Sequence, residues 1–279
     1  MVKRIITGIC LIAAVIPVLI FSHTWLFPGV VALISAVCIF EMLRCIGMHK
    51  KIALTAPLYV FAVVFPFLQR IFNDILNVAG LALIAAVLYI AYSFVWVIFS
   101  HGKISYPDIC TLCLTAFYIL LSLNMIIHIR DSENGQYIYF LILIGAWVTD
   151  TFAYFTGMLL GKHKLVPDVS PKKTVEGSIG GIVFCAIAFV AMGFLVGAIA
   201  KDTEPNFAFL AISGLIISLI SQAGDLIMSV IKRHYGVKDF SNILPGHGGM
   251  LDRMDSMLAV AFGIEMTLIF TYITGISFF

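Results

Sequence analysis

Nine long apolar runs follow one another along the chain and constrain its fold more than any other feature. Each has about 18 to 25 residues, the length of a helix that crosses the ~30 Å hydrocarbon core of a bilayer. Backbone groups in lipid must be satisfied internally, which favours helices, whereas a barrel would need shorter, alternating segments. We therefore predict an all-α, polytopic membrane protein with about nine transmembrane helices, at residues 5–22, 26–47, 52–69, 76–99, 106–128, 136–160, 177–200, 207–231 and 255–275.

The composition agrees with this fold class and limits the possible partners. Hydrophobic residues make up 61% of the chain and charged residues only 11%. The net charge of +2 is too small to indicate a nucleic-acid partner, so the lipid bilayer is the expected environment. We expect one integral membrane domain over residues 1–279, with a helical scaffold half at 1–130 and a half that carries the chemistry at 136–279.

Lysine and arginine are distributed unequally between the two sides of the predicted membrane. If the N-terminus is cytoplasmic, only Arg70, Arg130 and Lys201 of the seventeen basic residues face outside. Cytoplasmic loops carry an excess of basic residues in membrane proteins, so the count favours this orientation. The two longest polar loops, at about 161–175 and 232–254, then lie on the cytoplasmic side.

The densest polar window of the chain, residues 221–255, reads SQAGDLIMSVIKRHYGVKDFSNILPGHGGMLDRMD. It holds four Asp, two Lys, two Arg and two His in a chain with few charges. Because a charge inside a bilayer costs several kcal/mol, a cluster of charges between apolar spans indicates a functional site.

Three carboxylates in this window can converge. Asp225 shares a helix face with Ser221 and Ser229, since the three recur every four residues, and Asp252 and Asp255 are spaced i to i+3 at the start of the last span. Dipole compensation at a helix N-terminus would account for one Asp of the last pair, but not for three Asp beside basic side chains. Mg²⁺ usually binds a small number of carboxylates and completes its coordination shell with water and substrate phosphates. We therefore expect a cation to bind here.

Glycines dominate the segment KDFSNILPGHGGM, residues 238–250. Gly248 and Gly249 allow the backbone to approach a ligand closely. By itself this turn is a weak indication. His247 is compatible with a base, a phosphate donor or a turn residue, and the sequence leaves these alternatives open.

Acidic residues outside this window also lie in or beside apolar runs. Glu41 and Asp108 are interpreted as solvated helix ends. Asp150 lies within the sixth run, where a buried carboxylate needs a cation partner or a proton. A functional role and a helix-packing hydrogen bond both remain open for Asp150.

The segment SPKKTVEGSIGG, residues 170–181, joins the sixth and seventh runs. Lys172 and Lys173 stand beside the hydroxyls of Ser170 and Thr174, ahead of a glycine-bearing helix start. Ammonium groups, hydroxyls and helix N-terminal N–H groups are suited to bind phosphates. Contact with anionic lipid headgroups is the alternative.

The residues from Ser229 to Asp255 also resemble a known family. SVIKR, four residues, KDFS, two residues and LPGHGGMLDRMD resemble the signature of the phosphatidate cytidylyltransferase (CDP-diacylglycerol synthase) family over 27 residues. SPKKTVEG and the segment DTFAY from Asp150 resemble further blocks, although Val175 stands where an aromatic is expected. The resemblance covers the last half of the chain strongly, and the first half only by hydropathy.

The resemblance implies a reaction in which phosphatidic acid attacks CTP to give CDP-diacylglycerol and pyrophosphate. It implies Mg²⁺, with a second cation as an option, and a homodimer. The protein would lie in the cytoplasmic (inner) cell membrane as a multi-pass protein with its active site on the cytoplasmic side. Such a displacement requires positioning and charge neutralisation rather than a protein nucleophile.

Roles for individual residues follow by position. The expected metal ligands are Asp225, Asp252 and Asp255, which with Lys238 and Arg253 form the expected catalytic set. The expected substrate-binding residues are Asp150, Ser170, Lys172, Lys173, Thr174, Glu176, Ser229, Lys232, Arg233, Asp239, His247, Gly248 and Gly249.

Two alternatives come from other functional classes. Intramembrane acids also build the sites of secondary transporters for organic anions, but here only Glu265 lies near mid-span, and no paired Gly- or Pro-interrupted spans are found. A CTP-dependent lipid kinase shares the substrate chemistry but would not explain the full signature. There is no GxxxxGK[ST], HExxH or GxSxG motif in the chain.

Overall fold

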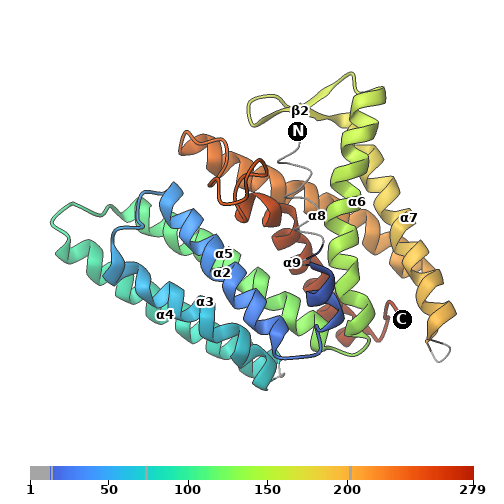
Figure 1. The fold of residues 1–279 in the computed structure, drawn as a ribbon, viewed down its shortest axis with the longest axis horizontal. Helices are drawn as coiled ribbons and strands as arrows, with labels where there is room; N and C mark the ends of the chain where they lie inside the picture. The colour runs from blue at the N-terminus through green and yellow to red at the C-terminus, as the bar shows by residue number, and fades with distance from the viewer. Residues whose placement is uncertain (1–12, 14, 73–74, 201–202) are drawn as a thin grey trace. The chain divides into compact units, whose positions relative to one another are not determined.

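The fold was analysed in a computed structural model, which describes residues 13, 15–72, 75–200 and 203–279. In these residues eight helices are long and apolar enough to cross a membrane. The all-α, multi-pass fold predicted from the sequence is therefore confirmed. The helices are α2 (Leu26–Cys45), α3 (Ile52–Phe72), α4 (Ile75–Phe99), α5 (Tyr106–Asp131), α6 (Gly135–Leu160), α7 (Val175–Ile199), α8 (Phe207–His234) and α9 (Leu251–Thr274) (Figure 1). Half of the predicted first span, residues 5–22, lies outside the described residues.

The chain forms two compact units. The first contains residues up to Asp131 together with Tyr235–Arg253, and we call it the N-terminal unit. The second contains Ser132–His234 and Met254–Phe279, and we call it the C-terminal unit. The division therefore falls inside α9, after its first three residues.

In the N-terminal unit, α5 packs against α2, α3 and α4 (Figure 1). One end of this bundle is closed by Arg70 of α3, whose guanidinium donates two parallel bonds to Asp131 of α5 at 2.6 and 2.8 Å. Arg70 also donates to the backbone carbonyls of Ser22 and Thr24. Such a bidentate pair fixes both distance and orientation, so Arg70 ties three segments together.

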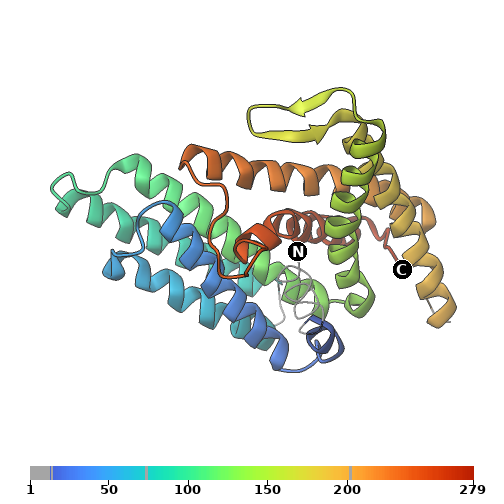
Figure 2. The same ribbon diagram turned by 45° about the horizontal axis from the view of Figure 1, so that its top comes forward.

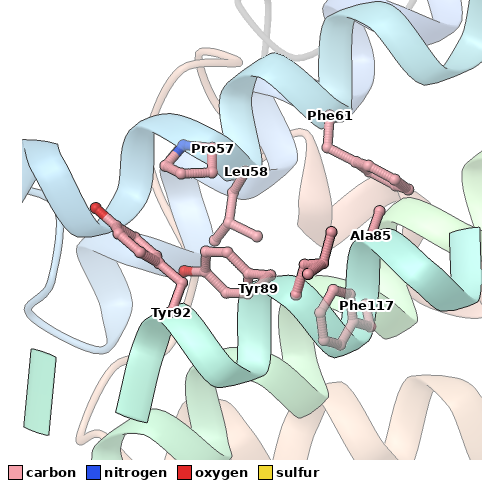
Figure 3. Close-up of a pocket in the computed structure, with 8 residues that line it drawn as sticks. Pro57, Leu58, Phe61, Ala85, Tyr89, Tyr92 and Phe117 are labelled. Atoms are coloured by element: carbon pink, nitrogen blue, oxygen red, sulfur yellow. The ribbon is translucent and has the colours of Figure 1, made fainter. Parts of the chain in front are cut away.

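The second turn of α3 contains a proline whose effect is compensated by the neighbouring helix. Pro57 has no N–H, so the carbonyl of Ala53 lacks its helical donor. The hydroxyl of Tyr92 on α4 donates to that carbonyl at 2.8 Å, and Tyr89 donates to the next carbonyl, Leu54, at 3.2 Å. Figure 3 shows both tyrosines reaching from α4 toward α3, beside an apolar cavity of about 270 Å³.

In the C-terminal unit, α6 and α7 lie side by side because α7 has glycines on the shared face (Figure 1). A Cβ at Gly180 would lie 2.2 Å from the Thr156 hydroxyl, and one at Gly181 would lie 2.9 Å from the Thr149 carbonyl. Small residues of this kind let membrane helices approach closely. The glycines of SPKKTVEGSIGG thus serve helix packing.

The polar segment before α7 is a two-stranded antiparallel hairpin, which the sequence analysis treated as a loop. Strand β1 (Lys164–Val166) pairs with β2 (Ser170–Thr174) (Figure 2). The hairpin forms because Pro167 and Asp168 occupy the centre of a tight turn, in which the N–H of Val169 donates to the carbonyl of Val166 at 3.3 Å. The hairpin ends directly at α7 and so fixes where the lysines of β2 lie.

Candidate active site

Two carboxylates and two lysines meet in the C-terminal unit. Asp225 of α8 and Asp255 of α9 are within hydrogen-bonding reach of each other. Lys173 of β2 places its Nζ 2.5 Å from Asp225 Oδ2, and Lys232 of α8 places its Nζ 4.0 Å from Asp255 Oδ2. The structure therefore brings four of the predicted site residues together from three elements.

This acidic pair lies in partly buried surroundings. The side chains of Lys173 and Asp225 are 23% and 24% exposed, and those of Lys232 and Asp255 are 9% and 12% exposed. Adjacent carboxylates repel each other strongly where water is scarce, so both can stay ionised only with positive charge nearby. Lys173 and Lys232 supply that charge.

A pocket of about 250 Å³ opens beside this cluster. One part of its wall is polar, with Asp150, Lys172 and Lys173, and another part is formed by Tyr154 and Met158 of α6. The carboxylate of Asp150 accepts a hydrogen bond from Ser256 of α9 at 3.1 Å, so Asp150 both joins helices and faces the pocket. An amphipathic phosphate compound would fit such a lining.

The glycine-rich segment belongs to the N-terminal unit and is held by carboxylates. Asp252 Oδ2 accepts hydrogen bonds from the N–H groups of Phe240 and Gly249, each at 2.9 Å. The turn itself needs glycine, because Gly246 and Gly248 adopt φ of 80° and 88°. Asp252, which was predicted as a metal ligand, is buried and holds this loop through these two hydrogen bonds.

Comparison with known proteins adds an independent observation. The model of the cytidylyltransferase family matches residues 2–272. This chain belongs to that family. It is 34% identical over 259 residues to a phosphatidate cytidylyltransferase from Staphylococcus haemolyticus, covering 92% of this chain and 95% of the relative. The protein of that name from Bacillus subtilis is 35% identical over 268 residues, covering 93% and 94%. The family resemblance inferred from the sequence is thus confirmed.

Other predicted site residues of this family member lie on the surface. Among the basic ones, the exposed side chains are suited to reach a soluble anion. They are Lys172, Arg233, Lys238 and Arg253, and Asp239 is exposed as well. Ser170 and Ser229 are half-buried.

Thr174 and Glu176 organise the junction of the hairpin with α7. Thr174 is the N-cap of α7, where its hydroxyl accepts the N–H of Gly177 at 3.1 Å. Glu176 accepts the N–H of Lys162 at 3.0 Å and contacts the ring of His163 at 2.6 Å. Thr174 therefore fixes the junction of β2 with α7, and Glu176 fixes the residues that lead into β1.

His247 stands in the turn that follows Pro245. Its N–H donates to the carbonyl of Leu244 at 2.9 Å, and its Nδ1 is buried without a hydrogen-bond partner in the described part of the chain. A turn role is therefore visible for the backbone of His247.

The predicted metal ligands can be checked against the positions of the carboxylates in the structure. Among the described residues, no three or more His, Cys, Asp and Glu side chains are grouped closely enough to hold a metal ion. Asp225 and Asp255 form a pair, whereas Asp252 lies in the other compact unit. Two adjacent carboxylates still fit Mg²⁺, which needs few protein ligands and binds water and phosphate oxygens besides.

Sequence reasoning missed one residue of this region. Glu41 was interpreted as a solvated helix end, and that interpretation is wrong: its side chain is fully buried, with a relative exposure of 0%. It accepts hydrogen bonds from Ser241, Met250 and Leu251. The available signal was its position within the apolar run 26–47 rather than after it.

Proposed function

We propose that this protein transfers the cytidylyl group of CTP to phosphatidic acid and so forms CDP-diacylglycerol and pyrophosphate. One observation carries the proposal: the paired carboxylates of Asp225 and Asp255, with Lys173 and Lys232 beside them, in a family member whose relatives are named phosphatidate cytidylyltransferase. The match over nearly the whole chain favours this function over a transporter or a lipid kinase.

The reaction requires little covalent chemistry from the protein. A phosphate oxygen of phosphatidic acid forms a bond to the α-phosphorus of CTP. The bond between that phosphorus and the oxygen bridging to the β-phosphate breaks, and its electron pair leaves with pyrophosphate. Lys173 and Lys232 are placed to stabilise the negative charge of the phosphates during this in-line displacement.

Mg²⁺ is part of the proposal, with Asp225 and Asp255 as the residues that would hold it. Asp252 remains a proposed further ligand, and a second cation remains an option. When bound, Mg²⁺ would neutralise phosphate charge and orient the triphosphate. The carboxylates of this chain would then be shared between the metal and the two lysines.

The pocket beside the cluster suits the lipid substrate. Phosphatidic acid combines a phosphate with acyl chains, and the lining combines Lys172 and Lys173 with the exposed Tyr154 and Met158. The exposed side chains of Arg233, Lys238 and Arg253 remain proposed contacts for the phosphates of the substrates. Because CTP is soluble and phosphatidic acid stays in its leaflet, the site is proposed to face the cytoplasm from the cell membrane. A homodimer is likewise proposed.

The test uses purified protein in detergent with Mg²⁺, phosphatidic acid and CTP labelled at either the α- or the γ-phosphate. Cytidylyl transfer puts the α-label into the lipid and releases the γ-label as pyrophosphate. A lipid kinase, supplied with diacylglycerol, would put the γ-label into the lipid instead. Absence of α-label from the lipid, with protein that is folded and monodisperse, would refute the proposed function.

A further inference from the structure

Glu41 of α2 is a buried carboxylate that binds a segment about 200 residues away in the sequence. Its Oε1 accepts the Ser241 hydroxyl at 2.5 Å and the N–H of Met250 at 2.9 Å, and its Oε2 accepts the N–H of Leu251 at 2.7 Å. All four residues belong to the N-terminal unit. Glu41 thus joins the helical bundle to the glycine-rich segment and to the first turn of α9.

The segment is held from two sides. Asp252 accepts the N–H groups of Phe240 and Gly249, while Glu41 accepts those of the next two residues, Met250 and Leu251. Gly249 leaves room for this arrangement, since a Cβ there would lie 2.6 Å from Glu41 Oε1. Neither carboxylate can move without releasing backbone N–H groups of the same loop.

A buried carboxylate is costly unless its oxygens accept hydrogen bonds. Burying a carboxylate is unfavourable without hydrogen bonds or positive charge, and Glu41 receives three bonds and the N-terminal dipole of α9. Charge-assisted bonds of this kind are about twice as strong as neutral ones. These bonds hold the loop in one arrangement, and a preorganised binding segment reduces the entropy cost of recognition.

We propose that Glu41 is a positioning residue for the proposed cytidylyl transfer. It holds residues 241–251 so that His247 and Asp252 are presented in one fixed arrangement to the nucleotide. The inference rests on the proposed function and extends it to the N-terminal half of the chain, for which only a scaffold role was expected. A residue with a purely structural role would change the amount of folded protein, but not the affinity of the folded enzyme for CTP.

The test is Glu41→Gln, which keeps the shape but replaces one accepting oxygen with an amide NH₂. Hydrogen–deuterium exchange measured by mass spectrometry should show the amides of Met250 and Leu251 exchanging roughly tenfold faster, because a hydrogen bond to a charged acceptor is lost. The KM for CTP should rise roughly tenfold, by more than kcat falls. Ser241→Ala, which removes only one of the three bonds, should show a smaller change of the same kind.

Ser35→Ala is the matched control. Ser35 lies on the same helix and is also fully buried, and its hydroxyl has no hydrogen-bond partner among the described residues. Its loop exchange and CTP dependence should match those of the wild type.

The possible results separate the inference from the function on which it rests. If wild-type protein transfers the label but Glu41→Gln leaves loop exchange and the KM for CTP within twofold of wild type, the positioning role is overturned and the proposed function stands. A loss of activity in Glu41→Gln with unchanged loop exchange also overturns the positioning role. If wild-type protein transfers no label, the proposed function fails. Unchanged loop exchange in Glu41→Gln would then also refute the role of Glu41 in holding the loop.

Discussion

Lys173 Nζ lies 2.5 Å from Asp225 Oδ2 and so connects strand β2 to the C-terminal half of α8. The sequence assigned these residues to different tasks, one to phosphate binding and one to metal binding. Their contact shows that this lysine and this carboxylate belong to one electrostatic unit. A cation at Asp225 would share this carboxylate with Lys173.

The first prediction concerns this ion pair. Lys173→Met should lower cytidylyl transfer by roughly 100-fold, in the range seen when one electrostatic stabiliser of a transition state is removed. It should also lower stability in metal-free buffer by about 1–3 kcal/mol, because Asp225 then faces Asp255 with less compensation. Label transfer and the thermal unfolding midpoint in EDTA measure the two effects.

Lys164→Met controls for the loss of a basic residue in the same hairpin. Lys164 is exposed on β1 and lies outside the pocket lining. Near-wild-type activity of Lys173→Met, or an equal loss in both variants, would remove Lys173 from the proposed site.

The second prediction concerns the metal ion. Mg²⁺ should raise the unfolding midpoint of the wild type, because a ligand that binds only the folded state stabilises it by mass action. Asp255→Asn should abolish both this rise and the label transfer, since a pair of carboxylates becomes a single one. The measurement is the midpoint as a function of Mg²⁺ concentration.

Two further variants sharpen this titration. Asp168→Asn, in the hairpin turn, should retain the full Mg²⁺ response. Asp252→Asn should abolish turnover in protein that stays folded, and its Mg²⁺ response decides whether Asp252 is a ligand or acts only through the loop that it holds. A full response in Asp255→Asn would exclude this residue from the metal site.

The helices could be predicted closely because length and apolarity are local properties. The run predicted at 207–231 became α8 at Phe207–His234, and the run at 52–69 became α3 at Ile52–Phe72. The start of α9 was misplaced, at 255 instead of Leu251. Its first turn is polar, and Glu41, from a distant helix, satisfies two of the N–H groups that begin it.

The site was predictable in its residue types but not in its contacts. Asp225 and Asp255 were predicted as site residues because charges in or beside membrane spans are rarely retained without a role, and Lys173 because a basic loop suits phosphate binding. That Lys173 reaches Asp225 depends on the hairpin, and the burial of Glu41 depends on a loop about 200 positions later. Neither follows from local periodicity.

The third prediction concerns the proline in α3. Tyr92→Phe should destabilise the protein by about 1 kcal/mol, since the carbonyl of Ala53 then has neither a helical donor nor a hydroxyl partner. For a chain of this size, that corresponds to a decrease in unfolding midpoint of about 2–4 °C.

A double-mutant cycle with Pro57→Ala tests the cause of that loss. An alanine at position 57 supplies the missing N–H, so Tyr92→Phe should then cost clearly less, and the two substitutions should be non-additive by about 0.5–1 kcal/mol. Tyr89→Phe is the internal control, because its acceptor Leu54 faces Leu58, which has an N–H in both backgrounds. The measurement is the unfolding midpoint of the four proteins in detergent. Additive effects at Tyr92 would show that its hydroxyl does not compensate for Pro57.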